Sequence, residues 1–521
     1  MESSTDRGVR VAELIGALSL ATDLGLGQPQ EHVLRQTMIA RRLAAAAGCS
    51  EDDQDTVFYV SLLAWVGCIS DSHELSKWFG DDIALRSDSY DVDKAGLPLV
   101  RFMVGHIGTD APALRRLTIL GRFLASGRSQ AARSFVAHCQ TTADIADRLG
   151  LSESVRVALG HSFERWDGMG APDGLRGDQI DLAMRIVQIA DDAEVHQRLH
   201  GTRQAAEMVR SRRGTEFDPA LVDVLTDHAA EIFDGLDDVD AWDRVLDSTH
   251  LGAEVVDDDA LTGALEAFAD YADLKSAWFL GHSRGVAALA SGAAENVGLP
   301  ADEIRLIERA GLVHDLGVIG VSSGIWDKDG VLSPTELERV RTHPYLTERV
   351  LRRQPRLAEI GALAVLHHER LDGSGYPSGL RSGSIPFSAR IVAAADVYHA
   401  MGEDRPHRRG RPVSDRIALL RGEVSAGRLD GDAVEAVLHC AGVGSRRRPT
   451  LPAGLTPREA EVLVLVASGL PTKEIARRLS VSPRTVSSHL EHTYAKIGVS
   501  TRGAAAMFAM RNGLVRPDAP S

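Results

Sequence analysis

The feature that most constrains the fold is a long internal repeat. Glu31–Ala40 aligns with Gly281–Ala290 at an offset of 250, and Glu164–Pro172 aligns with Glu369–Pro377 at an offset of 205. The difference between the offsets means that the first copy carries 45 extra residues in its middle. Because solenoid repeats have periods of about 20–50 residues, a repeat of this length indicates a duplicated domain.

Helical spacing of apolar residues dominates both ends of the first copy. Val33, Ile39 and Leu43 follow this spacing, as do Met184 and Val187, and no convincing alternation typical of a strand is present. A chain of 521 residues has room for two to four domains. We therefore expect an all-α chain of three domains: residues 1–240, 241–445 and 446–521.

The second copy is rich in side chains that can bind metals. Seven His and Asp residues recur across its apolar, helix-patterned segments: His282, His314, Asp315, His343, His367, His368 and Asp396. Imidazole and carboxylate groups together suit Fe, Mn, Zn or Ni. Seven ligands are too many for one ion and about right for two ions that share a carboxylate. A glycine-rich turn, Asp372–Pro377, lies within the same stretch.

Residues 262–440 resemble the HD-GYP family of metal-dependent phosphohydrolases, whose members cleave cyclic di-GMP. The likeness includes His314–Asp315 and Gly375–Tyr376–Pro377. It implies a centre of two divalent transition metal ions, Fe or Mn, that activate a bridging water against a phosphodiester. Catalysis would depend on His314 and Asp315. One ion would take His282, His314, Asp315 and Asp396, and the other His343, His367 and His368, with Asp315 bridging.

Other positions qualify this resemblance. Arg405 and Arg408 match positions that family members use near the substrate phosphate, although a solvated basic loop explains them equally well. Val318 stands where the family usually has a phosphate-facing Lys, which argues against fast catalysis. Trp278 replaces a Glu that some members use for a third metal, which favours two ions.

A helix is expected to begin just before one of the second copy's histidines. Ser333–Glu336 forms a capping box with Pro at the first helical position, so a helix should start there and carry His343 about two turns later.

The first copy lacks most of the same chemistry. Its counterparts of His314–Asp315 are Ala64–Trp65, and those of His367–His368 are Ser162–Phe163. The remaining potential ligands are His32, His138 and Asp191. Without the bridging Asp we expect these three to be hydrogen-bonded core groups and the first copy to bind no metal.

The last module contrasts with the rest of the chain in charge. From Arg446 to Val515 eleven Lys and Arg face four Glu, a net charge of +7, whereas the whole chain carries −15. A basic module on an acidic body suggests local binding of a polyanion. Thr456–Glu459 is a capping box, and two amphipathic segments separated by a short turn follow it, in the helix-turn-helix order.

Leu455–Leu514 resembles the LuxR-type DNA-binding domain, which implies double-stranded DNA as a partner and a homodimer on a two-fold site. Relatives often have Lys or Arg where this chain has Ser487 and Glu491. The residues expected to contact bases or phosphates are Lys473, Arg484, Thr485, Ser487, Ser488 and Lys496.

The remaining features of the sequence indicate where in the cell the protein is expected. Four scattered cysteines form no CxxC motif, the N-terminus lacks a signal peptide pattern, and no apolar run reaches the length of a membrane span. We therefore expect a cytoplasmic protein without a membrane partner.

The combined interpretation is a DNA-binding transcriptional regulator. Its second copy would sense or slowly hydrolyse a phosphorylated small molecule, such as a cyclic dinucleotide. Two alternatives remain: a phosphodiesterase whose tail only localises it, and a nucleotide receptor without turnover.

Overall fold

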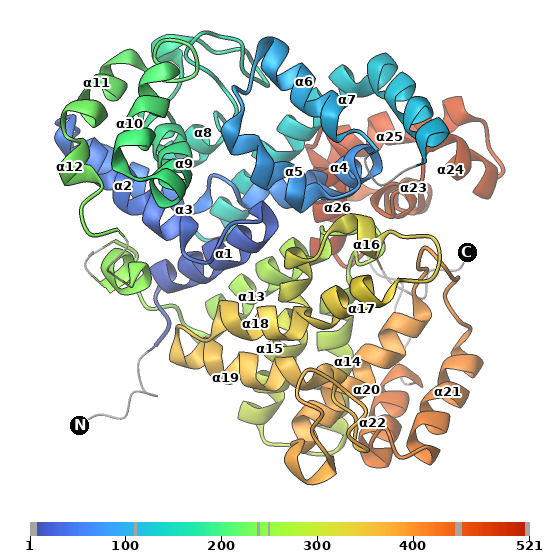
Figure 1. Cartoon of the computed structure of the whole chain (residues 1–521). Helices are drawn as coiled ribbons and strands as arrows, with labels where there is room; N and C mark the ends of the chain where they lie inside the picture. The colour runs from blue at the N-terminus through green and yellow to red at the C-terminus, as the bar shows by residue number, and fades with distance from the viewer. Residues whose placement is uncertain (1–7, 109–111, 237–239, 248–250, 443–450, 516–521) are drawn as a thin grey trace, which may run out of the picture. The chain divides into compact units, whose positions relative to one another are not determined.

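The chain folds into helices joined by turns (Figure 1). The computed structural model describes residues 8–108, 112–236, 240–247, 251–442 and 451–515. Over these ranges it contains isolated β-bridges but no strand, which confirms the all-α prediction. No helix in the described ranges is both long enough and apolar enough to cross a membrane.

The first copy lies in a compact unit, Gly8–Asp257. Its principal helices are α1 (Val11–Leu26), α2 (His32–Ala46), α3 (Glu51–Leu63), η2 (Val66–Asp71), α4 (Ser72–Phe79), α5 (Asp82–Asp88), η3 (Ser89–Asp91), α6 (Gly96–His106), α7 (Ala113–Arg148), α8 (Glu153–Leu159), α9 (Leu182–His200), α10 (Thr202–Ser211), α11 (Pro219–Asp227) and α12 (Ala229–Ile232).

The second copy begins a further compact unit, Asp258–Ser521. Its helices are α13 (Asp258–Asp273), α14 (His282–Asn296), α15 (Ala301–Val313), η6 (Leu316–Gly320), α16 (Ser323–Trp326), α17 (Pro334–Arg341), α18 (His343–Leu351), α19 (Pro355–Ala364), η7 (Val365–His368), η8 (Ser382–Ser384), α20 (Phe387–Gly402), α21 (Val413–Ser425) and α22 (Gly431–Gly442).

The two copies repeat the same helical scaffold. Helices α2 and α3 correspond to α14 and α15 with both ends shifted by 250 residues, and α9 begins 205 residues before α20. In the first copy α2 packs against α3 and α9, and in the second α14 packs against α15 and α20. The predicted apolar positions on α2 and α9 are buried. The sequence repeat is therefore a repeat of structure.

A close backbone approach recurs at one glycine of each copy. A Cβ on Gly317 of η6 would collide with the carbonyl oxygen of His343, and a Cβ on Gly67 of η2 would collide with that of His138. Glycine at these positions lets η6 lie directly against α18 and η2 directly against α7. In the second copy this contact brings the end of α15 close to His343.

The expected helix before His343 is interrupted. Helix α17 begins with the predicted capping box at Ser333, but it ends at Arg341 and His343 opens a new helix, α18. Pro344 accounts for the break, because it has no backbone N–H and is accommodated in the first turn of a helix. The prediction that one helix carries His343 was therefore wrong.

Over residues 451–515 the C-terminal module consists of a short helix, η9 (Pro452–Gly454), and the α-helices α23 (Pro457–Ala467), α24 (Thr472–Arg478), α25 (Pro483–Ile497) and α26 (Arg502–Arg511). Thr456 caps α23 in the predicted capping box, and Ser482 caps α25. Val462, Ile475 and Val486 are fully buried together in its core. The layout is the expected helix-turn-helix.

The chain's compact units divide after Asp257, close to the first predicted domain boundary at residues 240 and 241. The second predicted boundary, at residues 445 and 446, lies outside the described residues. The division into three domains stays a prediction.

Candidate metal centre

The scaffold of the second copy brings all seven predicted ligand residues together from five separate places along the chain. His282 opens α14, His314 and Asp315 join α15 to η6, and His343 opens α18. His367 and His368 end η7, and Asp396 lies on α20. Five of these side chains are almost completely buried, whereas those of Asp315 and His368 are 16% and 22% exposed.

The carboxylate of Asp315 lies between two groups of imidazoles. Its Oδ1 is 3.2 Å from Nε2 of His343 and 3.4 Å from Nε2 of His367. Its Oδ2 is 3.5 Å from Nε2 of His314 and 3.7 Å from Nε2 of His282. Asp396 faces one member of each group, because its Oδ1 is 3.3 Å from His282 and its Oδ2 is 3.8 Å from His368. One carboxylate oxygen is thus turned toward each group.

Backbone carbonyls fix the tautomers of three of these histidines. Nδ1 of His314, His343 and His367 lies 2.8, 2.6 and 2.7 Å from the carbonyl oxygen three residues earlier. A carbonyl can only accept a hydrogen bond, so each Nδ1 carries a proton and Nε2 is the nitrogen that each ring turns inward.

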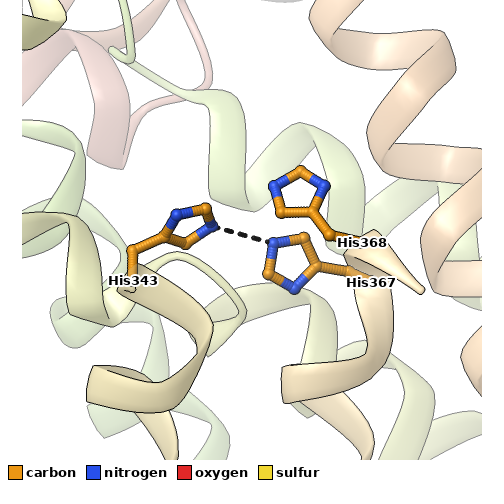
Figure 2. A group of neighbouring side chains, drawn as sticks. All are labelled: His343, His367 and His368. Atoms are coloured by element: carbon orange, nitrogen blue, oxygen red, sulfur yellow. Dashed lines mark hydrogen bonds between the residues drawn. The ribbon is translucent and has the colours of Figure 1, made fainter. Parts of the chain in front are cut away.

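One of the inward nitrogens has no partner, and two others share theirs. In the described part of the chain Nε2 of His314 is buried without a hydrogen-bond partner. Nε2 of His343 lies 3.2 Å from Nε2 of His367, and both nitrogens also face Oδ1 of Asp315. Figure 2 shows the two rings turned toward one another, with His368 alongside. An orphaned imidazole nitrogen and two imidazole nitrogens that share one carboxylate oxygen are what a bound cation would satisfy. The donor set therefore fits a divalent metal centre.

The electrostatics favour the protonation states that metal ligands need at both carboxylates and at two of the imidazoles. His282 differs, because burial alone would lower its pKa but Glu403 and Asp396 raise it well above its usual value. Burial alone would raise the pKa of Asp315 and of Asp396, but neighbouring histidines lower both well below the usual value. Burial lowers the pKa of His314 to about 4 and that of His368 well below its usual value. The carboxylates are thus ionised and these imidazoles neutral at pH 7.

The turn that contains Gly375–Tyr376–Pro377 lies against this cluster. Glu369 anchors the turn by accepting hydrogen bonds from the backbone N–H groups of Ser378 and Leu380, at 2.7 and 2.8 Å. The ring of Tyr376 lies 4.6 Å from that of His368, and the guanidinium of Arg341 lies over the tyrosine ring at 5.7 Å. The turn therefore forms one wall of the site.

The two arginines expected near a substrate phosphate are engaged by their own chain. Arg408 donates to the carbonyl oxygens of Ala400 and Glu403 at 2.7 and 3.0 Å, close to the end of α20. Arg405 donates to the carboxylate of Glu403 at 2.7 Å and to the carbonyl oxygen of Trp278 at 3.0 Å. A role at the substrate phosphate stays a prediction for both.

Sequence reasoning missed two polar residues beside His282. Nδ1 of His282 lies 3.2 Å from Nδ1 of His399 and 3.1 Å from Oε2 of Glu403. Burial alone would raise the pKa of Glu403, but His282 and Arg405 lower it well below its usual value. A signal was present in the sequence, because Asp396, His399 and Glu403 follow the i, i+3, i+7 spacing of one helix face.

In the first copy hydrogen bonds and aromatic rings occupy the corresponding positions. His138, the counterpart of His343, has its Nε2 2.7 Å from the carbonyl oxygen of Ala64. The ring of Phe163 lies 4.6 Å from His138 and 6.3 Å from Trp65. The described part of this copy contains no group of His, Cys, Asp or Glu side chains close enough to hold a metal.

Basic side chains of the first copy pair with three of its buried carboxylates, those of Asp191, Asp192 and Glu194. His32 contacts Glu194 through Nδ1 at 2.6 Å and Asp191 through Nε2 at 3.1 Å. Lys94 and Arg212 bind Asp192 at 3.0 and 2.8 Å. Lys94 comes from the segment between η2 and α7 in which this copy is longer, so it has no counterpart from which it could be predicted.

The predicted DNA-contacting residues lie on α24 and α25. Lys473, Arg484, Thr485, Ser487 and Ser488 are exposed, while Val486 between them is buried and anchors α25 to the core. Lys496 is engaged differently, because its Nζ lies 2.7 Å from the Oε2 of Glu459. This contact lowers the pKa of Glu459 to about 2 and ties the end of α25 to the start of α23.

Comparison with protein families finds two matches. The HD domain family matches residues 128–221 and 266–433, and so covers parts of both copies. The family described as bacterial regulatory proteins, luxR family, matches residues 453–509.

Similar proteins match most of the chain or about a third of it. A 3'3'-cGAMP-specific phosphodiesterase 3 of Vibrio cholerae serotype O1 is 30% identical over 414 residues, which cover 79% of this chain and 90% of that protein. The cyclic di-GMP phosphodiesterase response regulator RpfG of Xanthomonas campestris pv. campestris is 39% identical over 172 residues, which cover 32% of this chain and 44% of that protein.

A solved structure shares the fold. The crystal structure of a cyclic GMP-AMP specific phosphodiesterase of V. cholerae superimposes with a TM-score of 0.57 at 25% identity. The superposition covers 86% of this chain and all of that one.

The His32–Glu194 pair predicts a pH-dependent contribution to the stability of the first copy. Burial alone would lower the pKa of His32, but Glu194 and Asp191 raise it from 6.5 to about 10. Burial alone would raise the pKa of Glu194, but His32 lowers it from 4.5 to about 2. The contribution of His32 is therefore complete below pH 6.5 and lost as pH rises through about 10. That of Glu194 is complete above pH 4.5 and lost as pH falls through about 2.

Urea unfolding of the full chain, followed by tryptophan fluorescence, checks this dependence. His32→Gln should destabilise the first copy most between about pH 4.5 and 6.5, and the difference from the wild type should shrink toward pH 10. His228→Gln, at an exposed histidine of the same copy, should show no such trend. A His32→Gln effect that grows with pH would contradict the assignment.

Proposed function

Because the chain belongs to the HD domain family and ends in a LuxR-family domain, we propose that it is a metal-dependent phosphodiesterase of cyclic dinucleotides that also binds DNA. The observation that carries the proposal is the carboxylate of Asp315, with one oxygen turned toward each of two imidazole groups. The relatives supply the substrate class, since their names specify cyclic di-GMP and 3'3'-cGAMP.

The residues assigned to each ion follow from the two faces of Asp315. His282, His314 and Asp396 would hold one ion, and His343, His367 and His368 the other, with Asp315 bridging. Mixed imidazole and carboxylate ligands favour Fe or Mn among first-row metals. When bound, two such ions polarise a phosphodiester and lower the pKa of a water molecule.

The protein's own residues would orient and enclose the substrate. The turn around Tyr376 and the ring of Trp326, 6.0 Å from His343, border the cluster. The side chain of Val318 is 2% exposed and supplies no charge, so the site lacks a cation at that position for a phosphate. We accordingly propose slow turnover.

DNA binding would couple this chemistry to transcription. The exposed residues at the start of α25 are suited to the major groove, and Lys473 on α24 to the phosphate backbone. We propose a homodimer on a two-fold site, with DNA affinity that differs between substrate-bound and product states. A LuxR-family domain favours this regulator over an enzyme whose tail only localises it.

Metal content tests the binuclear assignment. Intact protein should contain about two transition metal ions per chain by elemental analysis. Asp315→Ala should lose them, because it removes the carboxylate shared by both groups. Asp191→Ala removes the buried carboxylate of the first copy that corresponds to Asp396 and should leave metal content unchanged. Absence of transition metal from intact, correctly folded wild type would refute the assignment.

Turnover should respond to the residue at position 318. Metal-loaded wild type should hydrolyse cyclic dinucleotides slowly, as chromatography of the products measures. A charge-assisted hydrogen bond of about 1.5–3 kcal/mol corresponds to about one to two orders of magnitude in rate, so Val318→Lys should accelerate hydrolysis by that amount. Nucleotide binding without product in both proteins would show that the second copy is a receptor.

Arg484 should contribute to DNA affinity through phosphate. Arg484→Ala in the full chain should weaken DNA binding on different sequences by similar factors. It should also reduce the salt dependence of the affinity by about one counterion, measured by mobility shift at several salt concentrations. Arg421→Ala, which changes an exposed arginine of α21, is the control. Equal salt dependence in Arg484→Ala and wild type would exclude this phosphate contact.

A further inference from the structure

We propose that Glu403 and His399 act as positioning residues that hold His282 in the metal centre, and that Arg405 stabilises this arrangement. The inference rests on the proposed function, because it assumes a metal ion beside Nε2 of His282. It assigns three residues of α20 and the following loop to metal binding by a route other than direct ligation.

The two ring nitrogens of His282 make different contacts. Nε2 points toward the metal cluster and lies 3.3 Å from Oδ1 of Asp396. Nδ1 points away from the cluster and lies 3.1 Å from Oε2 of Glu403. A carboxylate at this distance holds the proton on Nδ1 and leaves the lone pair of Nε2 free for a metal.

Glu403 is held in turn by two further groups. Its Oε1 lies 3.2 Å from Nδ1 of His399, one helical turn earlier on α20. Its Oε2 accepts a hydrogen bond from Arg405 at 2.7 Å. The carboxylate is therefore buried, charge-compensated and fixed from both sides, as a group must be to define the orientation of an imidazole.

Arg405 is itself anchored away from open solvent. Its guanidinium lies 4.7 Å above the ring of Phe279 and donates to the carbonyl oxygen of Trp278 at 3.0 Å. Its side chain is 12% exposed. These contacts explain why an arginine occurs here without requiring a substrate phosphate.

The opposite helix leaves space for His399. A Cβ at Gly285, on α14 one turn after His282, would collide with the imidazole of His399. Glycine at this position lets the imidazole of His399 approach α14 closely through Nε2, while its Nδ1 faces Glu403. Gly285 on α14 and His399 on α20 thus contribute to the same arrangement around His282.

A separate metal ion is the competing explanation. His282, His399 and Glu403 are close enough to share a cation. Such an ion would compete with the ion pair between Glu403 and Arg405, and it would require His282 to bind metals through both nitrogens. Hydrogen bonding satisfies the same atoms without disturbing the ion pair between Glu403 and Arg405 and without a second metal on His282. We therefore favour a positioning role for Glu403 and His399.

Titration of metal-free full-length protein with Co²⁺ distinguishes these roles, because the visible absorption of Co²⁺ reports its coordination. The wild type should bind two ions. Loss of such a partner typically lowers metal affinity about 10–100-fold, so Glu403→Ala should weaken one binding step by that factor and leave the other unchanged. Glu403→Gln keeps one acceptor and nearly the same shape, so it should weaken the same step less. Arg405→Ala should also weaken that step.

Glu435→Ala, which removes an exposed carboxylate of α22, controls for the loss of a negative charge and should change neither step. Unchanged Co²⁺ binding in Glu403→Gln and Glu403→Ala would overturn the positioning role while leaving the proposed function intact. A third Co²⁺ in wild type that disappears in Glu403→Gln would identify a metal ligand instead. If Arg405→Ala changes only the KM for nucleotide, Arg405 binds the substrate phosphate and does not stabilise the metal centre. A wild type that binds no Co²⁺ would refute both proposals.

Discussion

The architecture of the second copy depends on one carboxylate, that of Asp315, which faces two sets of imidazoles. Backbone carbonyls hold a proton on Nδ1 of His314, His343 and His367, so their Nε2 atoms converge on Asp315. Polar groups that are only partly satisfied are costly in a low-dielectric interior. We therefore propose that a bound cation completes the arrangement.

In the first copy, cationic side chains of the protein itself compensate the charges of the buried carboxylates. Asp191 and Asp192 are as buried as the carboxylates of the second copy, but His32, Lys94 and Arg212 neutralise them. An ion-pair network of this kind compensates the charge of these carboxylates within the duplicated scaffold. The absence of a metal from the first copy stays a prediction.

Sequence analysis predicted the parts of this account that depend on local pattern. The repeat offsets located equivalent helices, the capping boxes marked the starts of α17 and α23, and the family resemblance was confirmed by the HD domain and LuxR-family matches. The break at Pro344 was missed because the capping signal at Ser333 was extended too far. Lys94 could not be predicted, since its segment has no counterpart in the second copy. His399 and Glu403 were overlooked because a contact with the far side of His282 depends on tertiary packing.

The central claim is that two metal ions flank Asp315 while the first copy holds none. Anomalous diffraction from crystals of the Mn-loaded protein tests it most directly. The account predicts two peaks about 3.5–4 Å apart, one on the side of His282 and His314 and the other on the side of His343 and His367, with no peak beside Asp191. A single peak near Asp315, or a peak in the first copy between His32 and Asp191, would contradict it.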